Sequence, residues 1–185
     1  MANEVLEKVG TSFIVANSSY SPGTNTILGT YSATYDIDVV SLADATARQS
    51  LKWDWGATRP MAFEIRQTVE LSADAAGGSI DLYAYESHSA TAAVGNTGGC
   101  TGADAAYTGY AGMTLAESLK NLDFIGSLIT GIQNDTDGVV IGRVGMWAPK
   151  SRYGGIVIVN NSGIALHSDS VEAAVLFEPI VTEIQ

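Results

Sequence analysis

The sequence of 185 residues contains one cysteine and two histidines, which narrows the chemistry it can support. A single thiol, Cys100, forms no internal disulfide and provides no cysteine metal site. His88 and His167 are far apart in the sequence, and two histidines fall short of the set that a cupin-type metal centre needs. We interpret His167 and Asp169, two residues apart, as a surface hydrogen bond.

Known catalytic signatures are also missing. The chain has no nucleophile elbow, no phosphate-binding loop and no dinucleotide fingerprint. The segment 135–138 resembles the middle of a calcium-binding loop, but the flanking ligands are wrong; a hairpin turn is the favoured interpretation, and a weak calcium site stays open. Four carboxylates that alternate along strands are interpreted as a solvated strand face rather than as a glycosidase pair: Glu64, Glu70, Asp81 and Glu86. We therefore predict no enzyme, no cofactor and no metal.

Basic residues are scarce, and charge of either sign is low. Nine Lys and Arg face twenty Asp and Glu, for a net charge of −11. Nucleic-acid binding depends on clustered Lys and Arg, so the balance argues against it. Charged residues make up 16% of the chain, against roughly 25% in typical soluble proteins. Such a surface suits a chain covered by other subunits, although an ordinary β protein with a Ser/Thr surface has the same composition.

Long apolar runs are absent as well. No stretch approaches the roughly 18 residues that span a bilayer, and the first eight residues lack the pattern of a signal peptide. We expect a protein that is made in a cytoplasm, stays soluble and does not contact membranes.

The sequence is rich in period-two patterns, and segment 61–89 is the clearest. Its first half places Phe63, Ile65 and Val69 on one face, and its second half places Ile80 and Leu82 on one face. A short Gly-containing loop at 74–78 separates the halves, which predicts a β-hairpin. Because two strands bury too little to be stable, the apolar face must be covered by a second sheet.

Further strands are predicted at 12–16, 31–40, 51–55, 122–129, 139–147, 153–159, 164–167 and 171–177. Capping-box patterns predict two short helices, at 43–50 and 114–120. Segment 153–159 is apolar on both faces and is therefore central in a sheet. The fold class is all-β: an antiparallel β-sandwich of jelly-roll type with one or two short helices. Residues 1–30 are predicted to be an N-terminal arm or edge strand, and residues 31–185 a single sandwich domain.

Large aromatic side chains are the candidate contact residues. Trp53 and Trp55 lie on one face of a strand, as an interface anchor, a carbohydrate-stacking platform or part of the core. Segment 90–113 is long and rich in small residues, which favours a contact surface. The predicted partner interface consists of Trp53, Trp55, Tyr107, Tyr110 and Trp147.

Three strings, at 78–83, 122–128 and 153–163, resemble jelly-roll structural proteins of tailed bacteriophages, in particular head decoration or cement proteins. The resemblance implies a non-enzymatic virion protein that is made in the host cytoplasm, assembles as a homotrimer, and binds the major capsid protein on the outside of the head shell. The alternatives are a carbohydrate-binding β-sandwich module and a tail-associated adhesion protein.

Overall fold

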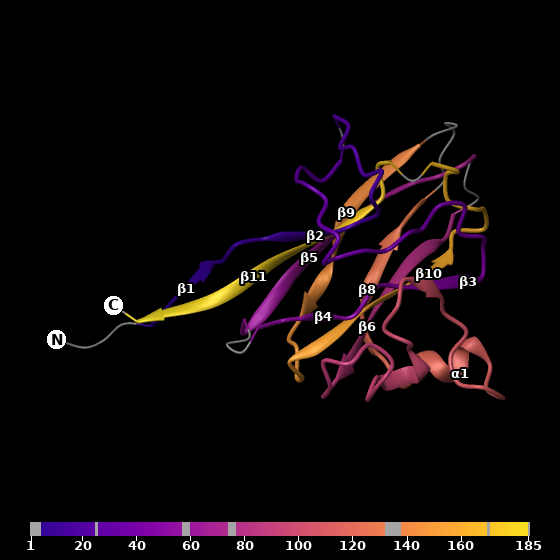
Figure 1. Ribbon diagram of the computed structural model, residues 1–185. Coiled ribbons are helices and arrows are strands. Elements are labelled where there is room, and N and C mark those ends of the chain that lie inside the picture. Colours follow the sequence, from indigo (N-terminus) through magenta and orange to yellow (C-terminus); the bar gives the residue numbers. More distant parts are fainter. Residues whose placement is uncertain are drawn as a thin grey trace.

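The computed structural model describes residues 5–24, 26–56, 60–73, 77–131, 138–169 and 171–184, with the backbone alone for 5–9 and 182–184. The regular secondary structure of the described residues is almost entirely β-strand, in two antiparallel sheets (Figure 1). The first sheet contains β1 (Val5–Val9), β2 (Phe13–Val15), β5 (Ala62–Glu70), β9 (Val139–Trp147) and β11 (Ala174–Ile184). The second contains β3 (Thr46–Gln49), β4 (Trp53–Asp54), β6 (Ser79–Ser87), β7 (Ala105–Ala106), β8 (Asp123–Ile129) and β10 (Tyr153–Asn161). This confirms the predicted all-β antiparallel architecture.

The strands pair in a nested order. β6 pairs with β8, β5 with β9, β3 and β4 with β10, and β1 and β2 with β11. The first sheet therefore has the order β1/β2-β11-β5-β9, and the second the order β7-β3/β4-β10-β6-β8. Successive pairs therefore alternate between the two sheets: β1/β2–β11 and β5–β9 lie in the first sheet, and β3/β4–β10 and β6–β8 in the second. The two sheets face each other over one core.

The sheets come very close along β8 and β9. A Cβ atom on Gly126 would lie 2.1 Å from the Val144 carbonyl oxygen, and one on Gly145 would lie 2.5 Å from the Ile125 carbonyl oxygen. Both neighbours are backbone atoms, which cannot rotate away as a flexible side chain can. The two glycines are therefore required for the sandwich to close along this side.

The prediction of a hairpin over 61–89 is wrong in its pairing and right in its packing. β5 pairs with β11 and β9, whereas β6 pairs with β10 and β8, so the two strands belong to different sheets. Phe63 and Ile65 nevertheless share the inter-sheet core with Ile80 and Leu82. Alternation shows which face of a strand is buried, but it does not show whether the next strand lies beside it or opposite it.

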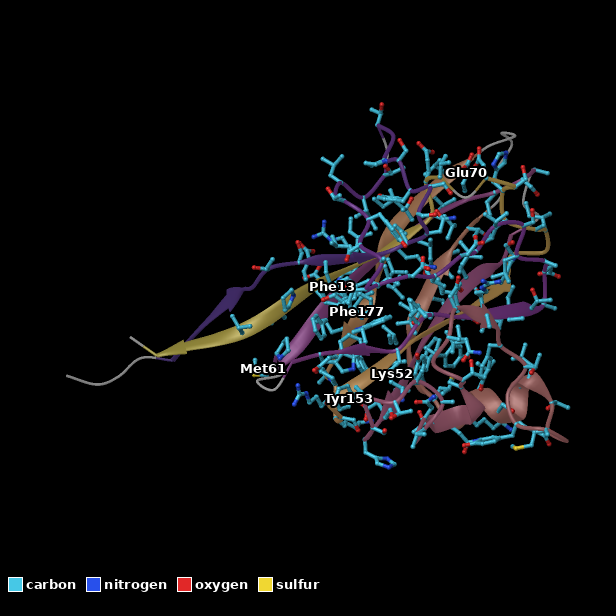
Figure 2. All side chains as sticks on the ribbon, viewed as in Figure 1. Phe13, Lys52, Met61, Glu70, Tyr153 and Phe177 are labelled. Carbon is cyan, nitrogen blue, oxygen red and sulfur yellow. The ribbon has the colours of Figure 1, made fainter. Side chains whose placement is uncertain are left out.

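Aromatic rings fill the centre of this core. The Phe13 and Phe177 rings stack in parallel planes with centroids 5.1 Å apart (Figure 2). Trp55 lies between Trp53 and Trp147, with its centroid 4.9 Å from each. The rings come from both sheets, so the core exists only when the two sheets face each other.

Two smaller apolar clusters cover the outer faces of the sheets. Residues from 100–122, which we call the outer cover, pack over β3, β6 and β10, and residues from 20–31 pack near β2 and the start of β11. As a result β10 is buried on both faces, which confirms the prediction for 153–159.

The helix predictions had opposite outcomes. α1 (Leu115–Leu119) forms with the predicted capping box: the Glu117 amide donates to Thr114 Oγ1 at 3.2 Å, and the Thr114 amide donates to Glu117 Oε2 at 2.8 Å. The helix predicted over 43–50 is wrong, because 46–49 is strand β3, in which Ala47 packs under the outer cover. A short 3-10 turn, η1 (Thr97–Gly99), completes the helical content of the described residues.

Several strand predictions need correction. Segment 31–40 makes an isolated bridge at Asp36 rather than a strand, although Ile37 and Val39 are buried in the core as their alternation indicates. Segment 122–129 is not largely buried, because β8 lies at a sheet edge and exposes Phe124 and Ile129. Segment 164–167 likewise makes an isolated bridge, at Leu166.

The last strand extends beyond its predicted end. β11 passes through Pro179, which lies between the part of β11 that pairs with β2 and the part that pairs with β1. A missing proline N–H is tolerated where a ladder is already interrupted.

β1 and the distal half of β11 leave the body as a two-stranded ribbon, which we call the arm (Figure 1). β1 begins and β11 ends at its tip, where Val5 pairs with Ile184. The predicted N-terminal segment 1–30 thus contains two successive edge strands on β11, of which β1 belongs to the arm.

Among the described residues, no helix has the length and apolar character needed to cross a membrane.

The aromatic core should carry much of the stability. Phe177 is fully buried and contacts rings from both sheets, so we expect Phe177→Ala to lower the free energy of unfolding by about 3–5 kcal/mol. The exposed Leu28 is the matched control, and Leu28→Ala should change it by less than about 0.5 kcal/mol. Urea denaturation measures both, and similar losses in the two variants would contradict this assignment of the core.

Candidate interaction surfaces

Four of the five predicted interface residues lie in the interior. Trp53, Trp55, Trp147 and Tyr107 are between 3% and 7% exposed, whereas Tyr110 is 43% exposed. The three tryptophans belong to the inter-sheet core, and Tyr107 belongs to the outer cover of the second sheet. For Trp53 and Trp55 the burial agrees with the alternative of core packing, and Trp147 and Tyr107 are buried as well. In this conformation the four side chains present no surface to a partner.

Local geometry explains the burial of Trp53 and Trp55. β4 is a two-residue strand on β10, and the alternation of side chains turns both indoles inward. A cavity of about 150 Å³ borders them near the base of the arm, lined also by Phe13, Tyr35 and Pro179.

An apolar groove lies on the outer face of the second sheet, between α1 and β8. It has a volume of about 400 Å³ and is lined by Tyr83, Ala116, Leu119, Lys120, Leu122 and Phe124. The Phe124 ring is 57% exposed and lies 5.1 Å from the Tyr83 ring. Sequence reasoning missed this surface, because it treated the strand that carries Phe124 as buried.

The position of α1 in this groove is fixed by polar contacts. The Tyr110 amide donates to Oγ of the buried Ser118 at 3.1 Å. The capping box fixes the first turn of the helix, so one wall of the groove is held in place without filling the groove itself.

The predicted contact loop, 90–113, is anchored to the sheet rather than extended from it. Gln49 Oε1 accepts from the Thr101 amide at 2.8 Å, and the Tyr107 hydroxyl donates to the Gly98 carbonyl at 2.6 Å. Cys100 is buried within this loop, and burial raises the pKa of its thiol. The exposed large apolar side chains of the loop are Val94, Tyr110 and Met113.

Lys52 holds the first part of the 90–113 loop. Its ammonium donates to Ser87 Oγ and to the carbonyls of Ser89, Thr91 and Val94, at 2.6–3.1 Å. All four acceptors are neutral, and partial burial lowers the pKa of Lys52. A lysine in this position orders loop carbonyls rather than pairing with a carboxylate.

The strand carboxylates do not form one solvated face. Glu64 pairs with Arg66 and Arg143, and Asp81 accepts from Ser79, Ser127 and Asn161. Glu70 is buried instead, which corrects its assignment to an exposed face. The cause is its place at the end of β5, where the segment carrying His167 crosses over it.

Glu70 lies beside the His167–Asp169 pair. His167 Nδ1 is 2.8 Å from Asp169 Oδ1, as the sequence predicted, and 3.4 Å from Glu70 Oε1. Burial raises the pKa of Glu70, while the hydrogen bond from His167 lowers the pKa of Asp169. Within the described residues, this is the group of three side chains able to hold a metal ion. The loop that resembles a calcium site, 135–138, lies mostly outside the described residues.

Comparisons with protein-family models, with curated proteins and with solved structures found no match.

Replacing Lys52 tests how the 90–113 loop is held. Lys52→Met keeps the aliphatic stem and removes the donors, so we expect faster amide hydrogen exchange at residues 89–96 and a stability loss of about 1–2 kcal/mol. The control is Lys120→Met, at the exposed edge of the groove. Unchanged exchange at 89–96 in Lys52→Met would show that the loop is held by other contacts.

Proposed function

We propose that this chain is a non-enzymatic structural protein of a bacteriophage virion, which decorates the head shell as a homotrimer and binds the major capsid protein. The observation that carries the proposal is the arm, because a two-stranded ribbon that leaves the body buries too little surface to be stable by itself. Unpaired strand edges are templates for pairing with another chain. The arm is therefore suited to joining neighbouring copies.

The strand order supports the same proposal. Four nested antiparallel pairs, divided between the sheets as β1/β2-β11-β5-β9 and β3/β4-β10-β6-β8, are the arrangement expected of a jelly roll. We propose that the fold is of this type. Fold type is shared by proteins of unrelated functions, so it agrees with a virion protein without singling one out.

The apolar groove is the surface that we assign to the shell. Exposed aromatic side chains that become buried on assembly are typical anchors of protein interfaces, and Phe124 with Tyr83 meets that description. The net charge of −11 favours a partner with a basic patch. Many copies on one shell would add weak contacts through multivalency, so no single groove has to bind tightly.

The carbohydrate-binding alternative loses the residues on which it rested. Trp53 and Trp55 are core residues and offer no stacking platform. The tail-associated alternative uses the same arm and groove with a different partner, and binding to purified tails rather than heads would favour it.

Deleting residues 1–9 tests the arm. β2 still covers β11 at 175–177, so we expect the body to keep its β-sheet circular dichroism while light scattering shows a monomer in place of a trimer. A deletion variant that remains trimeric would remove the arm from the proposal, and a monomeric full-length chain would remove the trimer.

Replacing Phe124 tests the groove. We expect Phe124→Ser to abolish cosedimentation with expanded head shells while leaving the trimer intact, because the ring is more exposed than buried. Ile129→Ser is the matched control, since Ile129 is an exposed residue of the same strand outside the groove. Equal shell binding by wild type and Phe124→Ser would exclude the groove as the contact.

A further inference from the structure

The end of the body away from the arm contains a second arrangement of chemical interest, around Glu70 (Figure 2). Glu70 is the last residue of β5, and Leu71 bridges to Leu166. The His167 amide donates to the Glu70 carbonyl at 2.9 Å. Backbone pairing therefore sets Glu70 and His167 beside each other, independently of any attraction between their side chains.

Asp169 is brought to the same place by a tight turn. Its amide approaches His167 Nδ1 at 3.4 Å, and its Oδ1 accepts from the Val171 amide at 3.4 Å. One oxygen from each carboxylate and one imidazole nitrogen lie within 4.8 Å of one another. Three side chains from two segments, distant in sequence, thus converge on one point.

The Glu70 carboxylate is incompletely satisfied within the described residues. Its side chain is 8% exposed, and its Oε2 is buried without a hydrogen-bond partner among them. A buried carboxylate oxygen normally has a donor or a cation, because its desolvation is costly. The nearby Asp169 carboxylate adds like-charge repulsion to the burial that raises the pKa of Glu70. Both carboxylates lie within ion-pair distance of His167 Nδ1, so two negative groups share one imidazole.

We propose that Glu70, His167 and Asp169 bind a divalent transition-metal ion of the Zn²⁺ class, with His167 Nδ1 and one oxygen of each carboxylate as ligands. Zinc accepts nitrogen and carboxylate ligands at about 2.0–2.2 Å, which in a tetrahedron places neighbouring ligands roughly 3.3 Å apart. The Nδ1–Oε1 distance of 3.4 Å and the Nδ1–Oδ1 distance of 2.8 Å are close to that spacing. The imidazole ligand favours zinc over calcium or magnesium, which prefer oxygen alone.

The proposed site is partly open to solvent, which gives a metal ion access and leaves room for a water molecule as the fourth ligand. The Asp169 side chain is 53% exposed and His167 is 21% exposed, so a hydrated ion can reach the cluster from solvent and keep a water ligand. The ion would lie between His167 Nδ1 and the two carboxylates and offset their negative charge. It would tie the end of β5 to the segment that leads into β11, independently of the proposed function in virion assembly.

Metal titration of the full-length chain tests the site. After treatment with a chelator, we expect calorimetric titration with zinc chloride to show one equivalent bound and the thermal midpoint to rise. Glu70→Gln and His167→Gln should each lose more affinity than the roughly 10–100-fold typical of residues that only support a ligand. His88→Gln is the matched control, because it removes the other, exposed histidine and should bind like wild type.

A second measurement keeps the test decisive if His167→Gln does not fold. Glu70→Gln keeps the shape of the side chain and removes its charge, so it is expected to fold. Cobalt(II) bound to wild type should give visible absorption bands of a low-coordinate site, and Glu70→Gln should lose them. No saturable zinc binding by wild type, retained binding in Glu70→Gln, or lost binding in His88→Gln would overturn the proposal and leave a carboxylate–imidazole hydrogen-bond cluster.

Discussion

The structure depends on the burial of aromatic rings between two sheets that cannot exist separately. Phe13 and Phe177 come from the first sheet, and Trp53 with Trp55 adjoins the second, yet all four contact one another. Apolar burial is the dominant favourable contribution to folding, and large rings supply the most area per residue. The glycines at 126 and 145, which let β8 and β9 approach, serve this contact by allowing the layers to close.

Sequence patterns predicted the composition of the layers better than their connections. Alternation at 61–71 and 79–86 identified the buried faces of β5 and β6, and the capping box at Thr114 identified α1. Pairing could not be predicted in this way, because one alternating strand fits beside or opposite another equally well. Ser41 and Asp44 have the spacing of a helix-capping box. This local preference for a helix is weak, and the pairing of β3 with β10 overrides it.

The candidate surfaces were harder to predict, for a related reason. The sequence points to large aromatic residues, and it does not say whether a tryptophan faces a core or a partner. Trp147 and Phe124 both lie on strands at the sheet edges that meet, yet one is buried and the other is not. Only the position of α1, set by a serine and a threonine, leaves Phe124 beside an open groove. The group of Glu70, His167 and Asp169 could be predicted only in part. His167 and Asp169 are two residues apart in the sequence, whereas Glu70 lies beside them because of a backbone bridge that no local pattern encodes.

Nested pairing has a consequence for how the molecule is made. β2 pairs with β11, which lies some 160 positions later in the chain. This pairing therefore cannot form until almost the whole chain has been synthesised. Contacts between such distant segments slow folding, because a large loop must close before they form. During that interval the earlier strands expose apolar faces and unpaired edges. Because such surfaces promote aggregation, we expect chaperones to bind the nascent chain.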